Sequence, residues 1–456
     1  SPSWLQLANR EFSPFLSILR YHLLNIAPTA ARQLGIFAPN RLAAIGRRRF
    51  DFCSHLPGGS WSKMHHPKED MMQFDFDTLI DRRHTNSLKW DVANGELPMW
   101  VADMDFRTSP EIIEALKSRV EHGIYGYATI PDEWNQAYVS WWKTRYHIDL
   151  IADRLVFCTG VVPAISSIIR KITTPNENVL IQTPVYNIFF NCILNNGRRV
   201  VESPLVYDGR HYEIDFEDLE RKLANPQTTV MILCNPHNPI GKVWNRDTLA
   251  RIGALCLKHH VIVISDEIHC DLTNPGITNT PFVSISPECA NNCITCMAPT
   301  KTFNIAGLQT AAVYVPNPQL HHKVWRGLNT DEVAEPNAFA IDATIAAYRK
   351  GAPWLDALRQ YLYDNKQAVD EFLSLNLPNI HCIASQATYL LWLDVSAYTD
   401  DSHRFANEIR QKTGLFVSAG TEYGGNGAKF LRLNVACPRA TLYDGLNRLK
   451  RAIIQR

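Results

Sequence analysis

Residues with chemical capability follow five short apolar runs of the sequence, one group after each run. The turn at residues 159–162 precedes a helical pattern, and Tyr186 follows the next apolar run. Asn238 lies in a loop with two Asn-Pro pairs, and Asp266 and Lys301 follow the fourth and fifth runs. Ligand sites of parallel α/β sheets form at the carboxyl ends of the strands. We therefore expect these groups to lie close together.

Each group suits one part of a phosphorylated aldehyde with a basic ring. The glycine turn before a helix exposes backbone N–H groups, which suit a phosphate. A buried Asp266 needs a partner such as a cationic ring nitrogen. A desolvated Lys301 can lose its proton and form a Schiff base with an aldehyde. With Tyr186 covering the ring and an Asn at its phenolic oxygen, the set meets the requirements of pyridoxal phosphate.

The segments between these groups alternate between short strands and longer amphipathic helices. Continuous apolar runs at 179–182, 230–233, 261–264 and 294–297 predict buried strands, and 246–259 predicts a helix between two of them. This alternation predicts an α/β fold with a mostly parallel sheet covered on both faces.

Further segments flank this pattern. Ser109 and Pro110 predict a helix start with Ser109 as the capping residue, and Gly123 predicts the end of that helix. From about residue 350, a long helix, two strand-like segments at 389–394 and 429–434, and a final helix at 441–454 follow. These elements predict a second, smaller α+β domain.

The overall composition is that of a globular protein. The chain has 456 residues, of which 46% are hydrophobic and 20% are charged, and its formal net charge is +1. This charge argues against nucleic acid or a membrane surface as the main partner. No apolar run approaches the roughly 18–20 residues of a membrane-spanning helix.

Residues 1–70 differ from the remainder, because they hold nine Lys/Arg against four Asp/Glu. Arg-rich heads of this kind include organelle transit peptides. The alternative, which we favour, is a basic extension that is disordered or not part of the fold.

The cysteines indicate little chemistry. Cys293 and Cys296 have the spacing of a redox or metal site, but they lie in a run that predicts a buried strand. We expect plain core cysteines and no metal site. Eleven cysteines in a long chain favour reduced thiols and a cytoplasmic location.

With these residues in place, the sequence resembles fold-type-I pyridoxal-phosphate enzymes of the aspartate-aminotransferase superfamily. Within them it is most similar to the cystathionine β-lyase / cysteine-S-conjugate β-lyase branch, the MalY/PatB family. The resemblance spans about residues 72–456 and is carried by residues 97–106, 123–127, 235–244, 265–269, 301–308 and 432–439. It implies a large domain with a mostly parallel seven-stranded sheet at 111–350, a small α+β domain at 351–456, and an N-terminal segment at 72–110 that packs on the small domain.

The resemblance also implies roles around the cofactor. Lys301 would hold pyridoxal phosphate covalently, and Asp266 would pair with its ring nitrogen. Asn238 and His269 would face its phenolic oxygen. Tyr186 would stack on its ring, and the N–H groups of Val161 and Val162 would hold its phosphate.

Two further residues are implied to complete the site. Tyr127 would reach the phosphate from the neighbouring subunit, which implies a homodimer with active sites at the interface. Arg432 would bind the substrate α-carboxylate as a bidentate fork, a task that Lys cannot copy. Tyr186 and Asn238 would also contact the substrate.

Three positions depart from the superfamily pattern. Ala298 stands where many members have Ser, and Gln309 stands where many aminotransferases have an Arg that binds phosphate. The phosphate site must therefore depend more on backbone N–H groups and on Tyr127. Ile240 replaces the commoner Thr of the Asn-Pro-Thr-Gly turn. Gln309 fits the lyase branch better than the aminotransferases.

The implied activity is α,β-elimination of L-cystathionine or a related cysteine S-conjugate to a thiol, pyruvate and ammonia. Lys301 would act as the general base at the substrate Cα. An aminotransferase of the same fold is the first alternative. A regulatory protein that retains the cofactor fold is the second.

Overall fold

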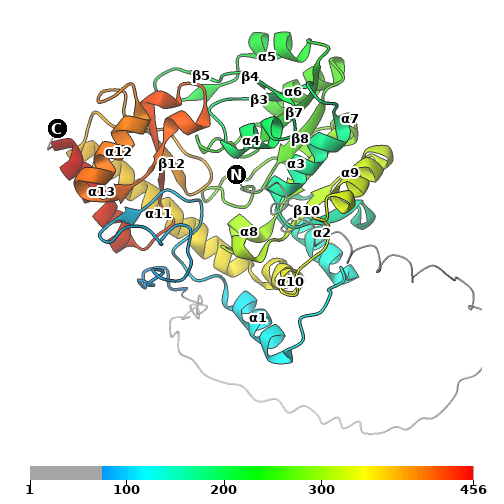
Figure 1. Cartoon of the computed structure of the whole chain (residues 1–456), viewed down its shortest axis with the longest axis horizontal. Helices are drawn as coiled ribbons and strands as arrows, with labels where there is room; N and C mark the ends of the chain where they lie inside the picture. Colours follow the sequence, from blue (N-terminus) through cyan, green and yellow to red (C-terminus); the bar gives the residue numbers. More distant parts are fainter. Residues whose placement is uncertain (1–73, 455–456) are drawn as a thin grey trace, which may run out of the picture. The chain divides into compact units, whose positions relative to one another are not determined.

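The computed structural model describes residues 74–454 (Figure 1). The predicted basic extension at residues 1–70 therefore lies outside the described residues. No helix within 74–454 is long and apolar enough to cross a membrane.

A seven-stranded sheet organises the larger part of the fold. Its order is β2-β10-β9-β8-β7-β3-β4, and β10 runs antiparallel to both β2 and β9, while the other neighbours pair in parallel. The mostly parallel seven-stranded sheet is thus confirmed, and each predicted strand between 179 and 297 is present. The strands are β2 (Leu155–Cys158), β3 (Asn178–Ile181), β4 (Arg199–Glu202), β7 (Thr228–Cys234), β8 (Ile262–Asp266), β9 (Cys293–Met297) and β10 (Ala311–Tyr314).

Helices cover both faces of this sheet. Alternate residues of each strand point to opposite faces, so each strand contributes to two apolar clusters. Val230 and Ile232 of β7 belong to one core cluster with α3 (Val161–Ile172), α4 (Ile188–Leu194) and α9 (Pro318–Thr330). Met231 and Leu233 belong to another with α5 (Phe216–Leu223), α6 (Arg246–Lys258) and α7 (Pro287–Asn291). Burial on both faces explains why the strands read as continuous apolar runs.

The two cysteines predicted to be core residues are buried in the sheet. Cys293 and Cys296 lie in β9 with no exposed surface, so the prediction of core cysteines is confirmed.

The helix predicted after residue 109 is α1 (Pro110–His122), and it packs against α10 (Ala340–Lys350), which also contacts α2 (Asp132–Tyr146). Its boundaries agree with the sequence prediction, and Gly123 ends it in the left-handed conformation. The prediction of Ser109 as the capping residue is also confirmed. Ser109 makes no capping hydrogen bond, and its Oγ is buried without a partner among the described residues.

The C-terminal elements form a separate sheet. Its strands are β11 (His381–Cys382), β12 (Leu390–Asp394), β15 (Phe430–Asn434) and β14 (Ser418–Ala419), paired antiparallel in that order. Three helices accompany them, α11 (Ala352–Asn376), α12 (Ser402–Thr413) and α13 (Arg439–Ile454), seen in yellow, orange and red in Figure 1. Both predicted strands are confirmed, and the last helix begins two residues earlier than predicted. The domain boundaries near 110 and 350 stay a prediction.

The chain before α1 lies along this C-terminal sheet. β1 (Leu97–Pro98) pairs in parallel with β13 (Leu415–Phe416). The N–H of Asn434 donates to the carbonyl of Met99, and the N–H of Asp105 donates to that of Ala436, both at 2.9 Å. These bonds support the predicted packing of the 72–110 segment on the C-terminal part. A small hairpin of β5 (Val206–Tyr207) and β6 (Tyr212–Glu213) completes the strands.

Gly241 offers a test of the contact between the loop after β7 and the C-terminal part. Its φ is +65°, and an added Cβ would lie 2.9 Å from the carbonyl oxygen of Ala387 and closer still to Ser385. Because backbone strain and a clash combine, we expect Gly241→Ala to lower the free energy of unfolding by about 3 kcal/mol. Urea denaturation measures this.

The matched control is Gly276→Ala. Gly276 has a similar φ of +78° but nothing within 4 Å of an added Cβ. Only the conformational penalty remains, so we expect a loss of about 1 kcal/mol. Equal losses in the two variants would contradict the close packing at Gly241.

Candidate active site

A cavity of about 190 Å³ opens at the carboxyl ends of the parallel strands. Seven of the residues predicted for the site line it: Val161, Val162, Tyr186, Asn238, Asp266, His269 and Lys301. They come from the segments that follow β2, β3, β7, β8 and β9. The sheet order places β7, β8 and β9 side by side, which explains how residues 238, 266 and 301 meet.

Lys301 lies in the short helix α8 (Pro299–Thr302) directly after β9. Its Nζ donates a hydrogen bond of 2.6 Å to the carbonyl of Ala102. Burial lowers the pKa of Lys301 to about 8, against the opposing effect of the Asp103 carboxylate; the Arg432 charge lowers it further. Near neutral pH, a substantial fraction of this amine is therefore unprotonated and nucleophilic.

Asp266 is the last residue of β8, and its register partners are Cys234 of β7 and Cys296 of β9. Only 5% of it is exposed, and its Oδ1 accepts a 3.1 Å hydrogen bond from the N–H of Ile268. Burial raises the pKa of Asp266 to about 7, against the effects of that N–H group and of Lys301. A cation placed in the cavity would stabilise the ionised carboxylate.

His269 and Asn238 present neutral polar groups to the same cavity. Burial lowers the pKa of His269 to about 3, so its ring is neutral at physiological pH. Its Nδ1 is buried without a hydrogen-bond partner in the described chain. The Oδ1 of Asn238 accepts a 3.4 Å hydrogen bond from Nη1 of Arg432.

The N-terminus of α3 forms the wall of the cavity after β2. Gly160 is its capping residue, and no side chain caps the helix. The first N–H groups of an α-helix have no intrahelical acceptor, so those of Val161 and Val162 are available to an anion. Tyr186 packs edge-on against Phe189, with ring centroids 5.6 Å apart. Burial raises the pKa of Tyr186 to about 12, so it stays a neutral phenol.

Arg432, in β15 of the C-terminal sheet, does not itself line the cavity but borders it through its hydrogen bond to Asn238. Its Nη2 donates to the carbonyl of Trp100 at 2.9 Å, and its guanidinium lies 4.8 Å from the centroid of the Tyr423 ring. Its Nε is buried and has no partner in residues 74–454. Both terminal nitrogens of the guanidinium are thus held, and its Nε is left without a partner.

Tyr127 does not line the cavity of its own chain. It is fully exposed, and its neighbours Ile124 and Tyr125 are 67% and 52% exposed. Gln309 is exposed and Ala298 is buried, and neither lines the cavity.

Eight further residues line the cavity without having been predicted for the site: Ala102, Thr159, Gly160, Pro163, Cys234, Ile268, Thr300 and Ala306. The two threonines add hydroxyl groups to the wall formed by α3 and α8. Ala102 belongs to the 97–106 segment, which carried the family resemblance without any assigned role. Nothing in its residue type indicated that its carbonyl contacts Lys301.

The polar groups of the cavity fit pyridoxal phosphate. The buried Asp266 suits a cationic ring nitrogen, Nδ1 of His269 and the amide of Asn238 suit an oxygen on the ring, and the start of α3 suits a phosphate. The amine of Lys301 suits the aldehyde.

Comparison with known proteins agrees with this geometry. Residues 97–449 match the aminotransferase class I and II family, and the chain belongs to that family. It is 44% identical to cystathionine β-lyase PatB of Bacillus subtilis, over 83% of this chain and all of PatB. It is 34% identical to Protein MalY of Escherichia coli, over 83% of this chain and 99% of MalY. The predicted family is therefore confirmed.

A solved structure shows the same fold. Cystalysin of Treponema denticola, whose crystals contain a pyridoxal 5′-phosphate cofactor, superimposes with a TM-score of 0.82 at 34% identity. The match covers 84% of this chain and all of cystalysin. The predicted fold class is thereby confirmed.

The lowered pKa of Lys301 predicts a pH dependence for cofactor capture. Only the unprotonated amine attacks an aldehyde, so the second-order rate of pyridoxal-phosphate binding to the cofactor-free protein should rise with pH. We expect a midpoint near 8, against about 10.4 for an unperturbed lysine. Stopped-flow absorbance measures the rate, and a midpoint near 10 would contradict the desolvated amine.

The raised pKa of Asp266 predicts a stability cost. Its pKa is higher in the folded than in the unfolded chain, so ionisation opposes folding as the pH rises through about 4 to 7. We expect Asp266→Asn to raise the free energy of unfolding of the cofactor-free protein at pH 8, by up to about 4 kcal/mol. The gain should shrink at pH 5. Urea denaturation at both values checks this, and a pH-independent effect would contradict it.

Proposed function

We propose that the protein is a pyridoxal-phosphate-dependent carbon–sulfur β-lyase. Its substrate would be L-cystathionine or a related cysteine S-conjugate, and its products a thiol, pyruvate and ammonia. The observation that carries this proposal is the 44% identity to cystathionine β-lyase PatB along the entire length of that enzyme. The cavity supports it, because the predicted cofactor groups converge there.

The residues of the cavity divide between cofactor and substrate. Lys301 would hold the cofactor aldehyde, and Asp266 would face its ring nitrogen. Asn238 and His269 would face its phenolic oxygen, and Tyr186 would cover its ring. The N–H groups of Val161 and Val162, with the hydroxyl groups of Thr159 and Thr300, would hold its phosphate.

Pyridoxal phosphate, when bound, supplies an electron sink for the carbanion that forms at the substrate Cα. The protein directs that chemistry. Ionised Asp266 keeps the ring nitrogen protonated. Arg432 binds the substrate α-carboxylate and so fixes the orientation of the Cα–H bond.

Once the substrate amine has taken its place on the cofactor aldehyde, the freed Nζ of Lys301 would perform the proton transfer. Its pKa of about 8 suits a base that works near neutral pH, because the amine can both accept and return a proton. The proton taken from Cα can then be delivered to the departing sulfur at the substrate Cβ. The remaining enamine hydrolyses to pyruvate and ammonia.

The proposed assembly is a homodimer. Tyr127 is fully exposed beside exposed Ile124 and Tyr125, an arrangement suited to burial against a second copy. Tyr127 of one subunit would then reach the phosphate in the other. The small domain, the large cofactor-binding domain and the 72–110 segment would form each subunit.

The proposed location is the cytoplasm. Ten cysteines of the described residues are free thiols, nine of them buried, which suits a reducing compartment.

A product assay tests the function. We expect the purified holoenzyme to release thiol and pyruvate from L-cystathionine without any added keto acid. Pyruvate is measured with lactate dehydrogenase, and thiol with a chromogenic disulfide. The Lys301→Ala variant should lose at least about 10³-fold in kcat, since both cofactor attachment and the base are removed.

Two outcomes would favour the alternatives. Turnover that requires a keto acid acceptor would contradict the lyase and support an aminotransferase. Biological activity that survives Lys301→Ala would support a regulatory protein.

A further inference from the structure

Residues 100–105, which we call the strap, have no regular secondary structure, and Ala102 among them lines the cavity. The carbonyl groups of residues 100–104 each accept a hydrogen bond from a side chain. Trp100 accepts from Arg432 at 2.9 Å, and Ala102 accepts from Lys301 at 2.6 Å and from the hydroxyl of Tyr389 at 3.0 Å.

The remaining carbonyls are held in the same way. The Nδ2 of Asn434 donates to Val101 at 2.5 Å and to Asp103 at 2.7 Å. The Nδ2 of Asn304 donates to Met104 at 3.0 Å. Two of the donors to the strap, Lys301 and Arg432, are the residues that the proposed function needs most. The position of the strap therefore fixes where an amine and a guanidinium point.

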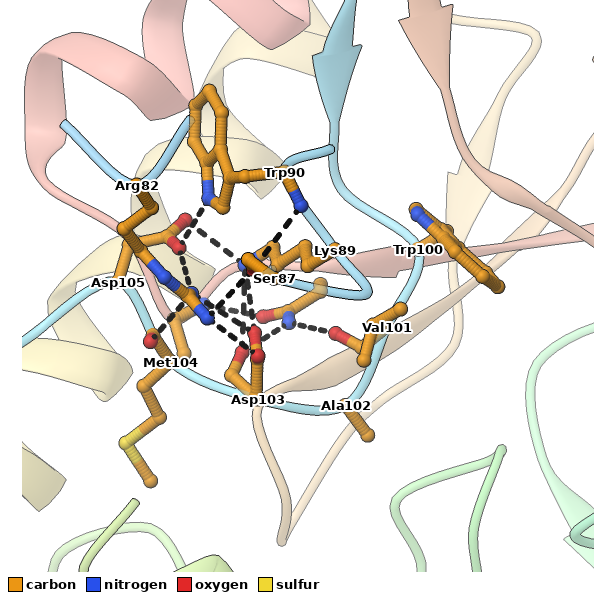
Figure 2. A network of polar contacts seen from close by, with 12 residues as sticks. Arg82, Ser87, Lys89, Trp90, Trp100, Val101, Ala102, Asp103, Met104 and Asp105 are labelled. Carbon is orange, nitrogen blue, oxygen red and sulfur yellow. Dashed lines mark hydrogen bonds and ion pairs between the residues drawn. The ribbon is translucent and has the colours of Figure 1, made fainter. Parts of the chain in front are cut away.

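The carboxylates of the strap are held by a cluster of opposite charges, shown in Figure 2. We name Arg82, Lys89, Asp103 and Asp105 the ion-pair cluster. Arg82 bridges the two acids, with Nη2 2.7 Å from Asp103 and Nη1 2.6 Å from Asp105. Nζ of Lys89 lies 2.9 Å from Asp105 and 3.5 Å from Asp103. Trp90 donates a further 2.7 Å bond to Asp105.

Burial of the ion-pair cluster carries a desolvation cost. Lys89 is 1% exposed and the Asp105 side chain is 6% exposed. Ion pairs buried to this extent gain little net stability, because desolvation offsets attraction, but they fix geometry once formed. Removal of one partner leaves an uncompensated charge. The cluster is thus poorly explained as a source of stability alone.

We infer that the ion-pair cluster positions the strap over the cavity and thereby orients Lys301 and Arg432. The inference rests on the proposed lyase function, because orientation matters for a reaction at those two groups. Arg82 and Lys89 are positioning residues, since neither touches the cavity that holds the reacting groups. The carboxylates of the strap form the ion pairs, and the carbonyl groups of the strap hold the side chains of Lys301 and Arg432.

The test compares Lys89→Met and Asp105→Asn with a matched control. Glu96→Gln removes an ion pair from the same N-terminal segment, because Glu96 binds Arg410 at 2.6 and 2.8 Å, but Glu96 makes no contact with the strap. All three holoenzymes are assayed well below their melting temperatures. We expect kcat/KM for L-cystathionine to fall about tenfold or more in the two cluster variants, since small misplacements of catalytic groups are costly. The kcat/KM of Glu96→Gln should remain within about twofold of that of the wild type, although its melting temperature should also fall.

Hydrogen–deuterium exchange supplies a readout independent of activity. We expect faster exchange in peptides covering residues 99–106 of the cluster variants, and wild-type exchange there in Glu96→Gln. If Lys89→Met does not fold, Arg82→Lys replaces it, because it keeps the charge but cannot bridge both acids. Its kcat/KM and strap exchange should change in the same direction.

Two results separate the possible failures. The positioning role would be overturned if Asp105→Asn showed the same hydrogen–deuterium exchange in the strap and the same kcat/KM as Glu96→Gln. A wild-type enzyme that releases no pyruvate would overturn the proposed function instead, and strap exchange would still test the cluster.

Discussion

Burial of opposite charges at the ends of adjacent parallel strands is the constraint on which the site depends. Asp266 ends β8 between β7 and β9, and Lys301 follows β9. Desolvation raises the pKa of the acid to about 7 and lowers that of the amine to about 8. Both groups therefore change charge within reach of neutral pH, as catalytic groups must. A sheet covered by helices on both faces supplies the low dielectric that these shifts require.

The C-terminal sheet and the strap supply further contacts to the site at the carboxyl ends of the large sheet. Arg432 comes from β15, and its guanidinium meets both Asn238 and the carbonyl of Trp100. The strap in turn is tied to Lys301 through Ala102. Groups from three distant parts of the chain thus share one hydrogen-bonded network.

Much of the site could be predicted because its residues follow apolar runs whose periodicity is local. The strands β7, β8 and β9 are buried on both faces and so have strong apolar signals. The edge strand β4 has charged residues at two of its four positions and β10 has alanine at two of four, so neither was predicted individually. Ser109 is the predicted capping residue of α1, but the burial of its hydroxyl without a partner is a tertiary effect that the sequence does not indicate. The role of Tyr127 stays a prediction, since it depends on a second chain.

The sequence by itself determined the class of fold, the order of the strand-end residues and the chemistry that they suit. These follow from residue types and their spacing, which are local properties. Only the tertiary structure decided that the carbonyl of Ala102 faces Lys301 and that Lys89 is buried against Asp105. A backbone carbonyl has no signature in the sequence, and an ion pair between residues 89 and 105 forms only when packing removes both from water.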